Sequence, residues 1–317
     1  MTIQILLLIA GLVLILLGAN YLVDGSSSIA KRFGISEFVI GLTIVGIGTS
    51  TPEMVVSFLS AFQGKADMAI GNVVGSNIFN TFMILGATAL VAPMIITRSN
   101  LKKDIPINVG VTILLIILGM NFTLFGYGND QLSRIDGLIL LAIFAWYLWS
   151  SFKNDSSDDE NSAIAVKSVP VSILMISAGL AGLIIGGKLF VNSATELAKM
   201  FGVSDKFIAI TVMAAGTSMP ELATCIVAAL KGRGQLALGN ILGSNISNIL
   251  LILGGAAVIH PLSFTGMTPV DLGAVLLSCI IVFLCAYLFK KKQIDRIEGV
   301  IMLLIEAAYM WYLISNL

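Results

Sequence analysis

The sequence predicts an all-α membrane protein in which ten transmembrane helices form two inverted repeats of five helices. Three observations lead to this fold class: an extreme apolar composition, ten separate apolar stretches, and a long internal repeat. Of the 317 residues, 57% are hydrophobic and only 11% are charged, and the mean hydropathy is +0.99. Soluble domains are roughly 45–50% apolar and about 25% charged, so the composition indicates a multi-pass membrane protein.

The ten apolar stretches are each long enough to cross a bilayer as a helix of about 17–25 residues. They begin near positions 3, 36, 66, 106, 135, 169, 205, 235, 269 and 297. Between the fifth and the sixth, the hydrophilic segment KNDSSDDENS lacks apolar residues and predicts a flexible linker. We therefore expect a first five-helix repeat at 1–152, an acidic linker at 153–168 and a second five-helix repeat at 169–317.

The second half of the chain repeats the first half at a constant offset of 168 residues. GISEFVIGLTIVGIGTSTPEM, from Gly34, matches GVSDKFIAITVMAAGTSMPEL, from Gly202, at nine of 21 positions. MAIGNVVGSNIFN, from Met68, matches LALGNILGSNISN, from Leu236, at eight of 13 positions. Because five is an odd number of spans, the second copy enters the membrane in the opposite direction. Inverted repeats of this kind are typical of secondary transporters.

The basic residues predict the orientation in the cell membrane. Thirteen Lys and Arg residues lie between spans on the side that carries the linker, and four lie on the opposite side. Cytoplasmic loops carry the excess of basic residues, so we expect a cytoplasmic linker and both termini outside. The net charge is zero, which predicts no nucleic-acid partner. Membrane lipid is the expected surrounding, and the sequence indicates no obligate protein partner.

The sequence places a carboxylate in the middle of an apolar span in each half, at Glu53 in GTSTPE and at Glu221 in GTSMPE. An ionised carboxylate at the bilayer centre costs at least about 2.5–3.5 kcal/mol, so a compensating partner is expected. Helical spacing puts hydroxyl groups three and four residues earlier on the same face as each glutamate. These hydroxyl groups belong to Thr49 and Ser50 in the first half and to Thr217 and Ser218 in the second half.

A proline precedes each glutamate, at Pro52 and at Pro220. Inside a helix, proline removes a donor and clashes with the carbonyl four residues earlier. We therefore expect the carbonyls near Gly48 and Gly216 to lack helical partners and to be available to a cation.

Two further polar stripes supply more oxygen atoms, and their members are spaced by four residues. They are Asn72, Ser76 and Asn80 in the first half and Asn240, Ser244 and Asn248 in the second half. The serine and the last asparagine of each stripe are expected to point between the repeats, whereas the first asparagine makes hydrogen bonds between helices. The neighbouring glycines, Gly71, Gly75, Gly239 and Gly243, would let helices approach closely.

The donor set predicts a site for hard cations. Carboxylates, hydroxyls, amides and carbonyls suit calcium, which takes six to eight oxygen ligands. Neither motif contains His or Cys, so zinc and copper fit poorly. The sequence predicts no cofactor and no enzyme, because no nucleophile with a base accompanies the acids.

These paired motifs, GTSTPE with GNVVGSNIFN and GTSMPE with GNILGSNISN, resemble the two alpha-repeats of the sodium/calcium exchangers, in the calcium/cation antiporter superfamily. The resemblance implies exchange of Ca²⁺ for Na⁺ by alternating access. It also implies a core of spans 2, 3, 7 and 8, with spans 2 and 7 broken at the GTSxPE motifs and spans 1 and 6 sliding against the core. Carried over by position, the implied calcium ligands are Glu53, Glu221 and the carbonyls of Thr49 and Thr217, and the implied sodium ligands are Ser50, Ser76, Ser218, Ser244 and the carbonyl of Ala214.

Asn248 departs from the pattern of this family. Relatives with a sodium-driven site often have an aspartate here, whereas this chain has amides at both Asn80 and Asn248. Only two carboxylates remain in the expected site, so the driving ion, sodium or protons, stays open. A proton/calcium antiporter is therefore the alternative, and a cation channel lined by the same oxygens is the alternative from another class.

Glu306 lies in the tenth span and has no acidic counterpart in the first half. The fifth and tenth spans match through RIDG and RIEG at an offset of 162 residues, which aligns Glu306 with Phe144. We therefore expect Glu306 to lie outside the symmetric set of ion ligands.

Overall fold

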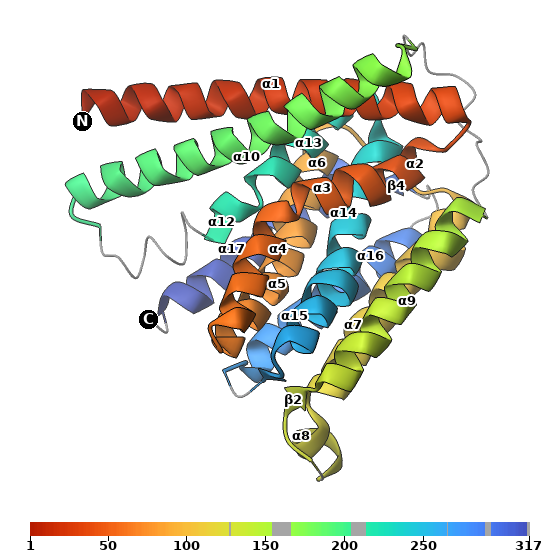
Figure 1. Ribbon diagram of the computed structural model, residues 1–317, viewed down its shortest axis with the longest axis vertical. Coiled ribbons are helices and arrows are strands. Elements are labelled where there is room, and N and C mark those ends of the chain that lie inside the picture. The colour runs from red at the N-terminus through yellow and green to blue at the C-terminus, as the bar shows by residue number, and fades with distance from the viewer. Residues whose placement is uncertain (127, 154–165, 204–213, 265, 289–292, 316–317) are drawn as a thin grey trace.

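The computed structural model describes residues 1–126, 128–153, 166–203, 214–264, 266–288 and 293–315, which are almost wholly helical (Figure 1). The first half contains α1 (Thr2–Phe33), α2 (Glu37–Ile40), η1 (Gly41–Val45), α3 (Gly46–Thr49), α4 (Thr51–Phe62), α5 (Ala66–Phe79), η2 (Asn80–Leu85), α6 (Gly86–Val91), β1 (Met94–Ile95), η3 (Asn100–Asp104), α7 (Ile105–Gly119), α8 (Asn121–Phe125), β2 (Gln131–Leu132) and α9 (Arg134–Lys153). The second half contains α10 (Val169–Met200), α12 (Ala214–Thr217), α13 (Met219–Leu230), α14 (Gly234–Ser247), η5 (Asn248–Leu253), α15 (Gly254–Ile259), β3 (Leu262–Ser263), α16 (Pro269–Leu288), β4 (Gln293–Ile294) and α17 (Arg296–Ser315). Elements marked η are π-helical. Most of the linker expected at 153–168 lies outside the described residues.

Seven of the described helices are long and apolar enough to cross a membrane, and the bent pair formed by α2–α3 and α4 would make an eighth. Two predicted spans are not among these. One corresponds to α7, which has 15 residues, and the other to α12 and α13, which follow residues 204–213 outside the described part of the chain. The fold is thus an all-helical membrane fold with seven or eight such spans, and the count of ten stays a prediction.

Four elements of the first half recur in the second half with bounds shifted by 168 residues. The bounds of α4, α5, η2 and α6 correspond in this way to those of α13, α14, η5 and α15. The turns after α4 and α13 also correspond, since Gly64 has φ 68° and Gly232 has φ 71°. Only glycine adopts this left-handed conformation without strain. The same local sequence signals therefore produce the same local structure in both halves.

Helices α1 and α10 pack along each other in antiparallel directions on one side of the molecule (Figure 1). Residue numbers rise along one helix as they fall along the other: Gly11 lies against Gly186, and Gly18 lies against Gly179. A Cβ atom at Gly18 would lie 2.7 Å from the carbonyl oxygen of Gly179. Only about a quarter of each helix's most apolar stretch is buried, 22% in α1 and 28% in α10, so this pair is peripheral.

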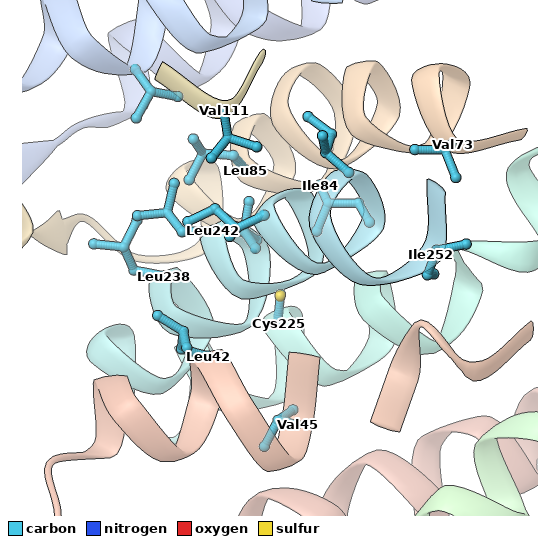
Figure 2. Packing of buried hydrophobic residues seen from close by; sticks show 14 of the residues in the cluster. Leu42, Val45, Val73, Ile84, Leu85, Val111, Cys225, Leu238, Leu242 and Ile252 are labelled. Carbon is cyan, nitrogen blue, oxygen red and sulfur yellow. The ribbon is translucent and has the colours of Figure 1, made fainter. Parts of the chain in front are cut away.

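The centre of the core is formed by α14 with η5 and by α5 with η2. In the most apolar stretch of the span Gly234–Ile259, 83% of the residues are buried, and in that of the span Ala66–Val91, 72% are buried. Figure 2 shows apolar side chains such as Leu42, Leu85 and Leu242 converging on this region from several helices. These spans therefore have the least contact with lipid.

The predicted close approach of helices is observed at two of the four glycines. A Cβ atom at Gly239 would clash with the carbonyl oxygen of Phe38, and one at Gly243 with that of Leu42. The residues that correspond to Phe38 and Leu42 in the second half are 206 and 210, which lie outside the described residues. The close approach predicted for the other two glycines, in α5, is therefore untested.

Two short antiparallel strand pairs join loops from different halves. β1 pairs with β4, and β2 pairs with β3. Each pair ties a connection of the first half to a connection of the second half, so the halves are linked at their loops as well as through the core.

Candidate cation-binding site

Both GTSxPE motifs lie at breaks between helices. Ser50 separates α3 from α4 with ψ 9°, and the span bends by 50° there. Ser218 separates α12 from α13 with ψ 8°. In each case the proline occupies the first turn of the new helix, where a missing N–H group breaks no helical hydrogen bond.

The carbonyl of Gly48 lacks the usual helical N–H donor four residues on, as expected, because that residue is Pro52, but the carbonyl is not free. The carbonyl of Gly48 accepts a hydrogen bond of 2.7 Å from the Thr51 hydroxyl. The reason is that Pro52 begins a helix instead of interrupting one, so the chain turns at Ser50 and brings the Thr51 side chain back toward Gly48. The second half has Met219 at the position of Thr51 and so has no equivalent hydroxyl.

The two glutamates are buried, each with 1% of its surface exposed. The Ser50 hydroxyl donates to Oε1 of Glu221 over 3.0 Å, and the Ser218 hydroxyl donates to Oε1 of Glu53 over 3.2 Å. Each serine thus serves the glutamate of the other motif. The expectation that serine and glutamate act together on one helical face is wrong, because the helix breaks between them.

The two threonines follow the same crossed pattern. The side chain of Thr49 interacts with Glu221, and that of Thr217 interacts with Glu53. The Thr49 hydroxyl also lies 3.0 Å from the carbonyl oxygen of Val45 and 3.2 Å from Oδ1 of Asn240. Since Thr49 and Thr217 end α3 and α12, their carbonyl groups lie at the breaks.

The predicted serines of the two polar stripes take different positions. The Ser244 hydroxyl donates to the carbonyl of Gly46 over 3.2 Å and so joins α14 to α3. Ser76 is buried and lines a cavity between α5, α16 and α17. Ala214 is the first described residue after 204–213, where α12 begins, so its backbone precedes the break by one helical turn.

The amides of Asn80 and Asn248 begin the π-helical segments η2 and η5. Their NH₂ groups donate across the interface between the halves: Asn80 to Oδ1 of Asn245 over 3.1 Å, and Asn248 to Oδ1 of Asn77 over 2.9 Å. The side-chain oxygens of Asn80 and Asn248, their Oδ1 atoms, are buried and have no hydrogen-bond partner among the described residues. π-Helical turns are frequent at functional sites, and η2 and η5 each start at a candidate ligand.

Asn77 and Asn245 were missed by the sequence analysis. The Asn77 amide donates to the backbone carbonyl of Asn245 over 3.1 Å, and the Asn245 amide donates to the Thr81 hydroxyl over 3.0 Å. Both residues belong to the GSN sequence that occurs in each half. Repetition of the same amide at the same place in both copies was the signal that could have revealed them.

Asn72 and Asn240 make the expected hydrogen bonds between helices. Asn72 donates to the backbone carbonyl of Glu53 and to the Ser57 hydroxyl, joining α5 to α4. Asn240 donates to the sulfur of Cys225 over 3.2 Å, joining α14 to α13. These residues hold the glutamate-bearing helices in place.

Four buried oxygen atoms at the centre lack a hydrogen-bond partner within the described part of the chain. They are Oε2 of Glu53, Oε2 of Glu221, Oδ1 of Asn80 and Oδ1 of Asn248. Buried polar atoms are rarely left unpaired, because desolvation costs about 1–3 kcal/mol for each group and more for a charged one. Among the described residues no group of three or more His, Cys, Asp and Glu side chains assembles. Two carboxylates with neutral oxygens suit Ca²⁺ or Na⁺.

Comparison with known proteins identifies similar chains along the whole sequence. The model of the family described as sodium/calcium exchanger protein matches residues 3–153 and 171–315. The putative antiporter CaxA of Alkalimonas amylolytica is 37% identical over 100% of both chains. The sodium/calcium exchanger MaX1 of Methanosarcina acetivorans is 32% identical over 98% of each chain. A solved structure of the sodium-calcium exchanger NCX_Mj, soaked with 10 mM Na⁺ and zero Ca²⁺, gives a TM-score of 0.84 at 33% identity and covers 100% of both chains.

Proposed function

The chain belongs to the sodium/calcium exchanger protein family and is a calcium/cation antiporter, and from this premise we propose that sodium ions drive its calcium transport by alternating access. The observation that carries the proposal is the crossed pair of hydrogen bonds, from Ser50 to Glu221 and from Ser218 to Glu53. This pairing leaves the Oε2 atom of each carboxylate buried and without a hydrogen-bond partner among the described residues.

We assign calcium to the two glutamates and to the carbonyls of Thr49 and Thr217. Sodium ions would use Ser50, Ser76, Ser218, Ser244 and the carbonyl of Ala214, with Asn80 and Asn248 completing the site. The proposed sodium ligands Ser50 and Ser218 donate to the glutamates that would bind calcium, so the two sets of ligands overlap and the ions compete. An empty site carries two uncompensated charges in a low-dielectric interior, whereas a site loaded with either kind of ion is nearly neutral. Competition therefore couples the two fluxes.

The architecture that we propose for this cycle is two inverted repeats of five spans, at 1–152 and 169–317. The recurring element bounds and the antiparallel packing of α1 on α10 support it. Inverted repeats provide inward-open and outward-open states of similar energy. The acidic linker would face the cytoplasm and both termini the outside, as the distribution of basic residues indicates.

Calcium uptake into liposomes under imposed ion gradients tests the driving ion. With pH clamped on both sides, an outward sodium gradient should drive calcium uptake, and uptake should stop when choline replaces sodium. A proton gradient without sodium should have no effect. Uptake driven by protons alone would establish the proton/calcium alternative, which Asn248 in place of an aspartate favours. Calcium flux that needs no counter-ion would indicate a channel.

A further inference from the structure

Helix α17 carries a buried carboxylate that the proposed transport site does not use. Glu306 has 6% of its surface exposed, and its Oε2 atom has no hydrogen-bond partner among the described residues. Helix α17 packs along η2 and α6, so Glu306 is on a helix that contacts the core directly. Ionisable groups within a membrane protein are costly and usually mark ion pathways.

Glu306 lines a cavity of about 350 Å³ between α5, α16 and α17. The wall from α5 includes Asn72 and Ser76, and the wall from α16 and α17 includes Asp271 and Tyr309. Ser76 is one of the proposed sodium ligands, so the cavity reaches the edge of the central site. Its volume leaves room for a cation that keeps part of its hydration shell.

The charged residues that line this cavity in the described part of the chain, Asp271 and Glu306, are both acidic. Oδ1 of Asp271 accepts a hydrogen bond of 2.8 Å from the Tyr309 hydroxyl, and Oδ2 accepts bonds from the backbone N–H and the hydroxyl of Thr268. Hydrogen bonds thus hold Asp271 in place, whereas Oε2 of Glu306 accepts no hydrogen bond from any described residue. The described residues that line the cavity include no Lys, Arg or His. A lining of this kind attracts cations and repels anions.

We propose that Glu306 forms a second binding site for hard cations, Ca²⁺ and Na⁺, in the cavity beside the central site. Glu306 binds the cation directly, and Asp271 with Tyr309 adds to the negative field. A cation held there lies next to Ser76 and therefore has a short path to the central ligands. The role of this site in transport rests on the proposed function. The existence of the site does not, because cation binding at Glu306 can be measured without transport.

Equilibrium binding of ⁴⁵Ca²⁺ to the purified full-length protein, in sodium-free buffer, tests the site. The background is the double variant Glu53→Gln/Glu221→Gln, which removes both central carboxylates. We expect weak residual calcium binding that is lost when Glu306→Gln is added and retained when Glu298→Gln is added. Glu298 is a matched control on α17: its Oε2 accepts from the backbone N–H of Asp295, and it does not line the cavity. Absence of residual binding, or binding that Glu306→Gln does not reduce, would overturn the proposal.

Transport kinetics provide the second measurement. In the otherwise unchanged protein, Glu306→Gln should raise the apparent KM for Ca²⁺ by roughly three- to tenfold while kcat stays the same, because a local negative charge raises the local cation concentration. The effect should shrink at high ionic strength, and Glu298→Gln should not produce it. An unchanged KM at low ionic strength would contradict the site. If the parent protein fails to exchange calcium for sodium, the proposed function fails, and the binding measurement still decides the site at Glu306.

Discussion

Each central glutamate accepts a hydrogen bond from the serine of the opposite motif, so the two carboxylates are positioned by both halves at once. Glu53 depends on Ser218, and Glu221 depends on Ser50. A movement of one motif relative to the other changes both carboxylates together. At the scale of single residues, this crossed pairing gives the simplest physical link between ion occupancy and the arrangement of the halves.

Replacing Glu53 or Glu221 with Gln should abolish calcium exchange while the protein still folds. The amide keeps the shape and can still accept from Ser218 or Ser50, but it removes one of two compensating charges. Breaking a buried charge pair costs about 3–5 kcal/mol, which predicts at least about a hundredfold loss of calcium affinity. Calcium flux in liposomes and elution as a single species in detergent check the prediction. Normal flux in both variants would contradict the assignment.

Replacing Asn245 with Ala should weaken ion binding without unfolding the protein. Oδ1 of Asn245 accepts from the Asn80 amide and so fixes the orientation of Oδ1 of Asn80, which has no partner among the described residues. The substitution removes this bond and the bond from the Asn245 amide to the Thr81 hydroxyl. Loss of the bond from Asn80 alone costs about 1–3 kcal/mol, so the apparent sodium affinity should fall by at least roughly tenfold. The measurement is the sodium dependence of calcium uptake. Asn121→Ala, whose side chain bonds to Leu118 outside the site, is the control and should leave this dependence unchanged.

At the scale of elements, short irregularities position the ligands. Helix breaks at Ser50 and Ser218 place the glutamates, and the π-helical segments η2 and η5 begin at the candidate amides. The intervening helices α5 and α14 stay regular and carry the small residues that allow close packing. The site therefore combines rigid helices with local departures from helical geometry at the ligands.

Replacing Gly239 with Ala should destabilise the protein. A Cβ atom there would clash with the backbone carbonyl of Phe38, and backbone cannot rotate away as a side chain can. Overpacking of this kind costs about 1–3 kcal/mol. Thermal unfolding in detergent should show a lower midpoint. The matched control is Gly110→Ala on α7, where no described atom lies within 4 Å of the new Cβ. Equal midpoints for both variants would show that the close approach of α14 is unimportant.

At the scale of the whole molecule, the peripheral pair α1–α10 lies against a core built on α5 and α14 (Figure 1). Most of the glycine contacts between α1 and α10 are with backbone atoms, as between Gly18 and Gly179, and Gly25 also meets the side chains of Met175 and Ile176. The two strand pairs tie the connecting loops of the halves to each other. This arrangement agrees with the proposed cycle, in which the peripheral pair slides against a core that keeps the ligands together.

Exchange by this protein should be electroneutral. The site contains two carboxylates, which balance one Ca²⁺ or two Na⁺, so neither loaded form carries net charge through the membrane. Moving one uncompensated charge through 100 mV is worth about 2.3 kcal/mol, so a charged form would respond strongly to potential. The exchange rate should change by less than about twofold when a potassium gradient with valinomycin imposes 100 mV.

The matched variant for this test is Asn248→Asp, which adds a third carboxylate at the centre. Its exchange should become dependent on the membrane potential, because three negative charges favour a third sodium ion. A wild-type rate that rises severalfold with potential would show that more than two sodium ions bind.

The sequence alone showed the repeated motifs and predicted the oxygen chemistry of the site, and the resemblance to the exchanger family implied the breaks of the helices at GTSxPE. The crossed partners of Ser50 and Ser218 could not be predicted, nor could the roles of Asn77 and Asn245. Spacing along a helix identifies neighbours on that helix only. These contacts join residues about 168 positions apart, so they depend on how the two halves dock.

The sequence determined which groups are costly to bury, because that cost is a property of each residue and its apolar surroundings. Tertiary structure decided which of these groups are satisfied by protein partners. It paired the carbonyl of Gly48 with Thr51, and within the described part of the chain it left Glu53, Glu221 and Glu306 each with one unpaired oxygen. The physical reason is that a hydrogen bond requires a donor within about 3 Å, and only the packed helices determine which donors come that close.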